Sequence, residues 1–395
     1  MRQDAAAERV TKVAIVQPVQ SPYWTERLKV LARSEDLDLT LLLERGSFAH
    51  RPGWQPLAID GVRLEVLQSM AIGAMRAGDD LGYRVQGVRS IPWRLVPALR
   101  RLHPDVVVVC NATEILLALP LRSLLRFRLA LIVEDTPHAS RNLGALARWI
   151  KEWAYRRADR WFAFSEDART YLNQIGIAQG VALSSWSLDM GEFQPSSSAE
   201  SPTRQSGATE DRAMVLFVGQ IIPRKGVTQL LEAWKQLSAS LRGKSRLVLV
   251  GDGPLLDDLR LFVREHGLSE VEIRGQQDYG TVRQLMQQAA LFVLPTMEDL
   301  FSLTVVEAMA CGCPVITTPF NGARELVEEG VNGWIADPSR PGALTASLAR
   351  ALSPDVDLRK MGAAARLRVE GMDNVPVMAR FAEGLRALAR GRSAE

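Results

Sequence analysis

Short apolar runs alternate with longer amphipathic stretches along the whole chain. Each run predicts a buried strand, and the stretches between them predict helices. The predicted strands are 13–17, 37–43, 106–110, 129–133 and 161–164 in the first half, and 214–218, 246–250, 271–273, 291–294 and 314–317 in the second. Nearly continuous apolar runs are typical of parallel sheets covered on both faces. The pattern therefore predicts an α/β protein with two doubly wound domains.

A polar segment separates the two halves. Residues 194–213 are rich in Ser, Pro, Gly and charged residues and contain almost no large apolar side chains. That composition is typical of a linker or mobile loop. We therefore expect one domain at 1–193, a second at 214–373, and a final helix within 374–395.

Composition and charge exclude several classes of protein. The chain has 395 residues, 47% of them apolar, which is enough for two cores. Its 48 basic and 45 acidic residues give a net charge of +3, so we expect no nucleic-acid partner. Cys110, Cys311 and Cys313 are too few for a disulfide framework, and the sequence suggests no metal site. We expect a cytoplasmic protein, because no apolar run is long enough to cross a membrane and residues 1–12 lack an apolar signal core.

The first candidate site follows the strand at 214–218. Gly219 permits a tight turn there, and Arg224 and Lys225 place two cations just before a predicted helix. The free N–H groups and the dipole of a helix N-terminus favour an anion, so a diphosphate is the natural ligand. The same residues also fit a solvated surface loop, and the sequence leaves both interpretations open.

The second candidate site follows the strand at 291–294. Asp299 precedes a predicted helix and Glu307 lies in its first turn, so the two carboxylates could accept hydrogen bonds from sugar hydroxyls. The backbone N–H groups of Ser302, Leu303 and Thr304 would point out of the start of that helix, where a diphosphate could lie. An alternative remains open, because Thr304 and Glu307 also have the spacing of a capping box.

Four segments in the second half resemble the family 4 glycosyltransferases, which are retaining enzymes of the GT-B fold. They are VGQIIPRKG with the LLEAW that follows, LVLVGDGP, PTMEDLFSLTVVEAMACGCPVI, and FNGARELVEEGVNGWIADP. Together they span about 120 residues in the family's order and spacing. The resemblance implies two Rossmann-like domains facing a cleft, with the last helix returning to the N-terminal domain.

The resemblance implies a role for each residue of the first segment. Lys225 is similar to the family's lysine on the donor diphosphate, and Arg224 beside it would support that lysine. Gly219 begins the loop. The family usually has an arginine directly after this glycine, but here the residue is Gln220.

The resemblance also assigns the two acids. The first of the pair would contact the donor sugar and the second the ribose, which gives these roles to Asp299 and Glu307. The family usually has glutamate at the first position, so Asp299 is one methylene shorter and Glu298 is a neighbouring rival. Ser302 stands where the family has glycine.

The implied reaction transfers a sugar from a nucleoside diphosphate to an acceptor hydroxyl with retention of configuration, in polysaccharide or glycoconjugate synthesis. The family manages this without a bound metal or other cofactor. Two alternatives of the same fold, an epimerase and a phosphorylase, stay open. A non-catalytic protein that binds nucleotide sugars is a third alternative, favoured by Gln220 and Ser302.

The resemblance places the acceptor, a sugar, a glycolipid or another hydroxyl compound, in the first domain. Its candidate lining is 17–24, 111–114 and 134–138, where His138 is the nearest match to the family's cleft histidine. Residues 147–161 combine Trp and Tyr with five basic residues. Such a helix can lie on the inner face of an anionic membrane, although a core helix with a solvated basic edge also fits.

Overall fold

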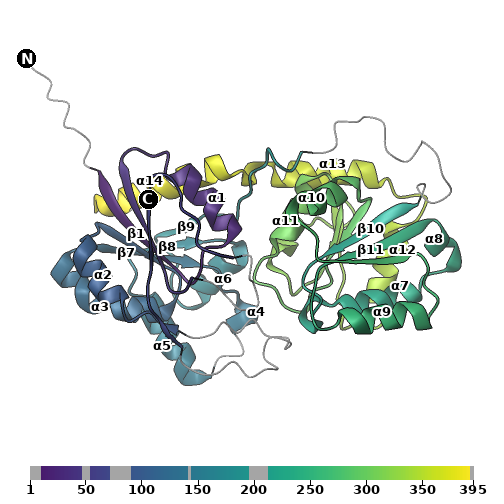
Figure 1. Ribbon diagram of the computed structural model, residues 1–395, viewed down its shortest axis with the longest axis horizontal. Coiled ribbons are helices and arrows are strands. Elements are labelled where there is room, and N and C mark those ends of the chain that lie inside the picture. The colour runs from purple at the N-terminus through teal and green to yellow at the C-terminus, as the bar shows by residue number, and fades with distance from the viewer. Residues whose placement is uncertain (1–9, 47–53, 72–89, 141–143, 195–211, 392–395) are drawn as a thin grey trace, which may run out of the picture. The chain divides into compact units, whose positions relative to one another are not determined.

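The computed structural model describes residues 10–46, 54–71, 90–140, 144–194 and 212–391 (Figure 1). These residues belong to two compact units. Unit 1 ends at residue 188 and resumes at 372, and unit 2 holds residues 189–371. Residues 195–211, most of the expected linker, lie outside the described residues.

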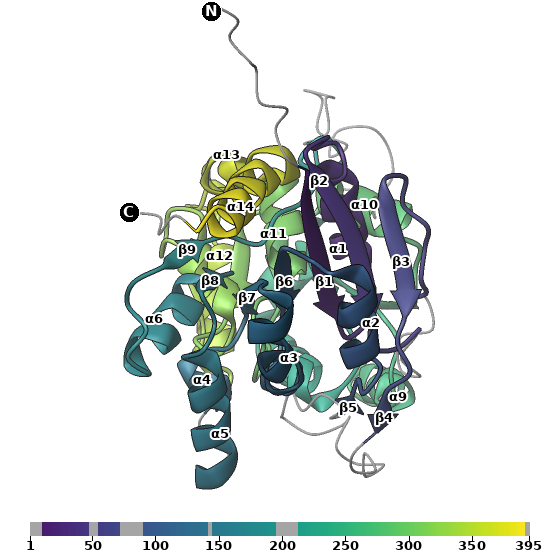
Figure 2. The ribbon, with the colours of Figure 1, turned by 90° about the vertical axis from the view of Figure 1, so that its left-hand side faces the viewer.

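Unit 1 is built on a seven-stranded parallel sheet in the order β3-β2-β1-β6-β7-β8-β9. Figure 2 shows these strands from one side of the unit. All five strands predicted for this half are confirmed. Their bounds are β1 Thr11–Gln17, β2 Leu37–Leu43, β3 Val62–Val66, β6 Val106–Val109, β7 Arg128–Val133, β8 Arg160–Ala163 and β9 Val181–Leu183. A separate antiparallel pair joins β4 (Met70–Ala71) to β5 (Ser90–Ile91).

Helices cover both faces of this sheet, and residues of β7 alternate between the two faces. Leu129, Leu131 and Val133 pack against α2 (Leu95–Leu102), α3 (Ala112–Leu125), α5 (Ala145–Tyr155) and α6 (Glu166–Gln174). Ala130 and Ile132 pack in the core on the opposite face, beneath α1 (Pro22–Leu31) and α14 (Asn374–Ala389). A short helix, α4 (Pro137–Ser140), follows β7.

The last helix of the chain, α14, completes unit 1. Its Phe381 ring lies 4.4 Å from the Phe162 ring of β8. Arg386 makes two hydrogen bonds to the carboxylate of Asp36, at 2.5 and 2.8 Å. The helix covers apolar residues on one face of the sheet that would otherwise be exposed.

Unit 2 is built on a six-stranded parallel sheet in the order β12-β11-β10-β13-β14-β15. The five strands predicted for this half are confirmed. The bounds are β10 Ala213–Val218, β11 Ser245–Val250, β12 Val271–Gly275, β13 Leu291–Val293, β14 Val315–Thr317 and β15 Gly333–Ile335. Its α-helices are α7 Val227–Lys235, α8 Ala239–Gly243, α9 Leu256–Glu265, α10 Tyr279–Gln288, α11 Leu303–Ala310, α12 Ala343–Ala351 and α13 Leu358–Val369.

The apolar spacing of 230–241 and of 323–329 predicts one helix in each stretch of unit 2, and both predictions were wrong in detail. The stretch 230–241 is divided between α7 and α8, because the side chain of Ser238 accepts the N–H of Leu241 and starts a new helix. The stretch 323–329 is a short 3₁₀ helix, Gly322–Leu326, in which the Asn321 side chain accepts the N–H of Ala323. In both places a side-chain cap decides the local structure.

The order of strands in each sheet locates its ligand edge. In unit 2 the chain runs outward from β10 to β12 and then crosses to β13 on the other side of β10. The loops after β10 and β13 therefore diverge at the carboxyl edge, where doubly wound sheets bind ligands. In unit 1 the corresponding point lies between β1 and β6.

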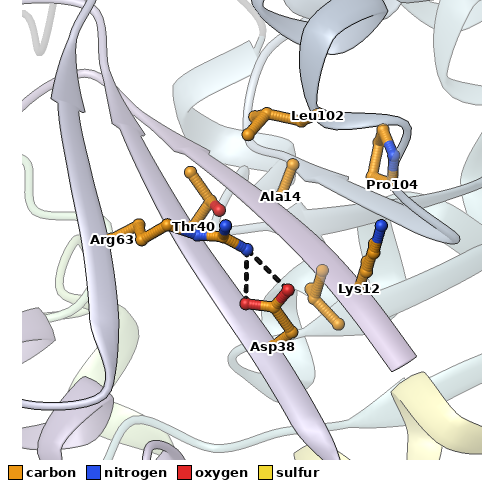
Figure 3. Close-up of a pocket in the computed structure, with 8 residues that line it drawn as sticks. Lys12, Ala14, Asp38, Thr40, Arg63, Leu102 and Pro104 are labelled. Atoms are coloured by element: carbon orange, nitrogen blue, oxygen red, sulfur yellow. Dashed lines mark hydrogen bonds and ion pairs between the residues drawn. The ribbon is translucent and has the colours of Figure 1, made fainter. Parts of the chain in front are cut away.

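A small hollow opens at the opposite edge of the unit 1 sheet (Figure 3). Lys12, Asp38 and Arg63 line it from the amino ends of β1, β2 and β3. Nη2 of Arg63 lies 2.5 Å from each carboxylate oxygen of Asp38. These two opposite charges in the hollow are therefore already paired with each other. This position, away from the carboxyl edge, separates the hollow from the expected ligand sites.

Candidate functional site

The loop after β10 packs closely against the loop after β13. Residues Pro223–Lys225 form one 3₁₀ turn, which ends at Gly226 with φ of 70°. A Cβ atom on Gly226 would lie 1.9 Å from the carbonyl oxygen of Pro295, so only glycine fits there. This close approach brings Arg224 and Lys225 beside the segment that carries the two candidate acids.

Hydrogen bonds join the same two loops. The backbone N–H of Met297 and the hydroxyl of Thr296 donate to the carbonyl oxygen of Arg224, at 2.7 and 3.0 Å. In return, Nη1 of Arg224 donates to the carbonyl oxygen of Glu298 at 2.7 Å. The guanidinium is therefore fixed by backbone contacts.

Asp299 lies at the centre of the charged residues. One of its carboxylate oxygens, Oδ2, pairs with Nζ of Lys225 and lies 3.9 Å from Nη1 of Arg224. The same oxygen accepts a hydrogen bond of 2.6 Å from the hydroxyl of Ser302. Burial raises the pKa of Asp299, but Lys225 and Arg224 outweigh this effect, and the net result is a lowered pKa. Asp299 is thus a partly buried, ionised carboxylate.

Helix α11 begins at this cluster, with Ser302 as its N-cap. The backbone N–H of Ser302 donates to Oδ1 of Asn321 at 3.2 Å, and the role of this N–H at a diphosphate stays a prediction. Leu303 and Thr304 occupy the first two helical positions, whose N–H groups have no partner inside a helix. They remain candidates for the diphosphate.

Glu307 is not part of a capping box. Because Ser302 is the N-cap, Glu307 is the fifth residue of α11 and lies beyond the position that a capping box requires. Its side chain is buried, and its Oε1 accepts a hydrogen bond of 3.0 Å from the hydroxyl of Tyr279. The structure thus removes the alternative that the sequence left open.

The remaining donor-site predictions fall in the same region. Gly219 lies against the loop after β11, because a Cβ on Gly251 would be 1.8 Å from its carbonyl oxygen. Gln220 follows Gly219 and is partly buried. Glu298 is buried and contributes its carbonyl oxygen to Arg224, whereas the carboxylate that meets Lys225 belongs to Asp299.

In unit 1, the segment 134–138 follows β7 at the carboxyl edge of the sheet. Asp135 is fixed on the α5 side, where it accepts hydrogen bonds of 2.6 Å from both Lys151 and Tyr155. His138 lies in α4, with its Nε2 shielded from solvent. The catalytic role of His138 stays a prediction.

Glu134 interacts instead with Arg27 of α1, which is fully buried. The guanidinium carbon of Arg27 lies 4.6 to 5.5 Å from the ring centroids of Trp24, Phe164 and Trp186. Burial lowers the pKa of Arg27 to about 9, while the charge of Glu134 opposes that shift. Burial raises the pKa of Glu134 to about 7, and Arg27 partly offsets it. The carboxyl edge of unit 1 therefore holds a carboxyl group that titrates near neutral pH.

Sequence reasoning missed Tyr279, Asn321 and Arg27. Each acts on a residue far away in the sequence or on a backbone group, so no spacing rule indicates it. Asn321 alone had a local signal, since it precedes glycine and asparagine commonly caps a turn.

Comparison with known proteins gives consistent matches. Residues 199–368 match the family described as glycosyl transferases group 1, and residues 22–182 match the glycosyl transferase 4-like domain. A putative colanic acid biosynthesis glycosyltransferase, WcaL of Escherichia coli K12, is 29% identical over 306 residues, covering 74% of this chain and 71% of WcaL. The uncharacterized glycosyltransferase MJ1178 of Methanocaldococcus jannaschii is 33% identical over 145 residues, covering 37% of this chain and only 39% of MJ1178.

The fold also matches solved structures. Anabaena HepE in complex with UDP and glucose aligns with a TM-score of 0.70 and 19% identity, over 95% of this chain and all of HepE. Together the two family matches account for most of both units described above. The chain belongs to the family 4 glycosyltransferases and has their GT-B fold.

Proposed function

We propose that this protein is a retaining glycosyltransferase that transfers a sugar from a nucleoside diphosphate sugar to an acceptor hydroxyl. The observation that carries the proposal is the meeting of Lys225, Arg224 and Asp299 beside the N-terminus of α11, at the switch point of the unit 2 sheet. Two cations and a helix start provide the positive potential that a diphosphate needs. Family membership supports the same assignment.

Each group has a defined role in the proposed reaction. The bond between the anomeric carbon and the phosphate oxygen breaks, and a bond from the acceptor oxygen to the same carbon forms on the same face. The departing phosphate oxygen takes the acceptor's proton. Lys225, Arg224 and the amides of Leu303 and Thr304 stabilise the charge on the leaving diphosphate. Asp299 faces the sugar, where its negative charge favours a developing oxocarbenium ion, and Glu307 binds the ribose.

The similar proteins suggest which donor and acceptor to propose. HepE was crystallised with UDP and glucose, and WcaL is named for colanic acid synthesis. We therefore propose a UDP-sugar as the donor and a growing polysaccharide or glycolipid as the acceptor. The acceptor would bind at the carboxyl edge of unit 1, along 17–24, 111–114 and 134–138, with His138 among the groups that contact it.

Calorimetry and a hydrolysis assay test the donor site. Wild type is titrated with UDP, GDP, ADP and dTDP, and the tightest ligand is then measured with Lys225→Ala. We expect about 10- to 100-fold weaker binding, as for loss of a charged hydrogen bond worth about 1.5–3 kcal/mol. Release of free sugar from the matching nucleotide sugar should fall as well.

The control is Lys244→Ala, which removes the same charge from an exposed position in the same unit. It should leave affinity within twofold of wild type. Unchanged affinity in Lys225→Ala would contradict the proposed diphosphate site. Tight binding with no sugar transfer or hydrolysis for any donor would favour the non-catalytic alternative.

We further propose that α5 of unit 1 docks on an anionic membrane, where a lipid-linked acceptor would be available. Leu146 and Trp149 are 71% and 61% exposed, and Ile150 beside them is 36% exposed. Exposed arginines flank these side chains on the same helix and at its end, namely Arg148, Arg156 and Arg157. An apolar stripe bordered by cations is typical of helices that lie in the interface of anionic bilayers. None of the helices within the described ranges combines the length and apolar character that crossing a membrane requires.

Vesicle co-sedimentation tests this surface. Wild type should bind vesicles of phosphatidylcholine with 30% phosphatidylglycerol and not vesicles of phosphatidylcholine alone, and Leu146→Ser with Trp149→Ser should abolish binding. Leu367→Ser is the matched control, because Leu367 is equally exposed on α13 of unit 2. Equal binding by the double variant and the wild type would refute the docking surface.

A further inference from the structure

Tyr279 holds the carboxylate of Glu307 from a neighbouring helix. Tyr279 is the first residue of α10, and its hydroxyl donates to Oε1 of Glu307 at 3.0 Å. Glu307 is only 1% exposed, whereas Tyr279 is 48% exposed. The tyrosine thus reaches from the surface of unit 2 to a buried acid.

The tyrosine ring is itself held in place. Asp278 caps α10 by accepting the N–H of Thr281 at 3.0 Å, which fixes the position of the next residue, Tyr279. The ring of Phe193 meets the ring of Tyr279 edge to face, with centroids 6.0 Å apart and planes at 87°. Such aromatic pairs restrict the ring beyond what simple burial would do.

Arg366 closes the network. Its Nη1 donates to the carbonyl oxygen of Phe193 at 2.6 Å and to that of Ala310 at 2.5 Å. Because Ala310 is the last residue of α11, the helix that carries Glu307 is tied to the aromatic pair at its far end as well. The contacts run from α11 through Arg366, Phe193 and Tyr279 back to α11.

We propose that Tyr279 is a positioning residue for the donor nucleotide, which holds the Glu307 carboxylate in the orientation that accepts the ribose hydroxyls of a nucleoside diphosphate. This inference rests on the proposed role of Glu307 at the ribose. A carboxylate already held in one orientation loses less conformational freedom when the ribose arrives, so the hydroxyl of Tyr279 increases affinity without touching the ligand.

A double-mutant cycle tests the proposal by calorimetry with whichever of UDP, GDP, ADP and dTDP binds most tightly. Tyr279→Phe keeps the ring on Phe193 and removes only the hydroxyl, and we expect about 5- to 10-fold weaker binding. Glu307→Ala removes the acceptor of that hydroxyl and should weaken binding by at least as much. In the Glu307→Ala background, Tyr279→Phe should have less than a twofold effect, because the two residues act through one contact.

The ribose supplies a readout that a purely structural role would not change. With the 2′,3′-dideoxy form of the same diphosphate, wild type and Tyr279→Phe should bind equally. Gln287→Ala is the matched control, since it removes a 2.7 Å hydrogen bond from the same helix to the carbonyl oxygen of Gln194, next to Phe193. It should bind the nucleotide as wild type does.

The outcomes separate the two claims. If Glu307→Ala weakens binding and Tyr279→Phe does not, or if their effects multiply, Tyr279 is not a positioning residue. If Glu307→Ala binds as wild type does, the proposed ribose role of Glu307 fails and the role of Tyr279 fails with it. Lys225→Ala still tests the diphosphate site in that case.

Discussion

Replacing Asp299 with asparagine should separate nucleotide binding from catalysis. In the structure the Asp299 carboxylate neutralises one of the two cations that would hold the diphosphate. Asparagine has nearly the same shape and can still accept a hydrogen bond from Lys225, but it carries no charge. Asp299 would then no longer offset the positive charge of Lys225 and Arg224 that attracts the diphosphate.

The expected size follows from Coulomb's law. A carboxylate and a phosphate about 6–8 Å apart repel each other by roughly 2–3 kcal/mol at an effective dielectric constant of 20. Part of that gain is lost, because Lys225 no longer has an ionised partner to orient it. We therefore expect Asp299→Asn to bind UDP about 3- to 10-fold more tightly, equivalent to about 0.7–1.4 kcal/mol. Sugar transfer should fall by about 100-fold, since removal of one preorganised electrostatic contact typically costs 10² to 10³ in rate.

Calorimetry gives the affinity and release of free sugar from the donor gives the rate. Asp257→Asn is the control, because it removes an almost fully exposed carboxylate of the same unit and should change neither quantity. Since the pKa of Asp299 is lowered below its usual value, the carboxylate stays ionised at neutral and alkaline pH, and the difference in affinity should be constant from pH 7.5 to 9, where the terminal phosphate of UDP is ionised as well. Weaker UDP binding in parallel with the lost rate would refute this account of Asp299.

Two further predictions concern folding. Gly226→Ala should lower the free energy of unfolding in urea by at least about 2 kcal/mol, because the new Cβ would clash with the Pro295 carbonyl oxygen. Gly243→Ala is the control: no atom lies within 4 Å of its new Cβ, so the change should be neutral or slightly stabilising. Equal effects of the two substitutions would contradict the close approach of the two loops. Glu134 has its pKa raised from 4.5 to about 7, so its protonated form is favoured in the folded state, and the stability this provides is present below pH 4.5 and is lost as the pH rises through 7. Wild type should therefore lose up to about 3 kcal/mol relative to Glu134→Gln between pH 4.5 and 8, and a difference independent of pH would show that the pKa of Glu134 is not raised in the folded protein.

The central strands could be predicted because a buried parallel strand must be apolar on both faces. Val106–Val109 consists of four valines, all buried, and such a run has few other interpretations. The edge strand Val62–Val66 contains Arg63 and Glu65 and is only partly buried, so it lacks that signal and was missed. Prediction therefore succeeded where burial on both faces fixed the residue type and failed where one side of a strand was open.

The candidate site could be predicted as a set of residues and not as a set of contacts. Asp299, Glu307, Lys225 and Arg224 were identified from two segments about 70 residues apart, and the structure brings three of them into one charged cluster. The hydroxyl of Ser302 on Asp299 could not be foreseen, because the resemblance implied a glycine at that position. Likewise, spacing alone could not distinguish a capping box from a ligand contact at Glu307, since that choice depends on which residue begins α11.

The two acids differ in a way that bears on how the donor would bind. Asp299 is already matched by Lys225, so an incoming phosphate competes with a carboxylate for the same ammonium group. A ligand with a single negative charge gains little from that exchange, whereas a diphosphate brings further charge that Arg224 and the start of α11 can receive. Glu307, in contrast, accepts a hydrogen bond from the neutral hydroxyl of Tyr279, which holds its carboxylate in one orientation. Charge at Asp299 would therefore select the diphosphate, and fixed geometry at Glu307 would select the sugar next to it.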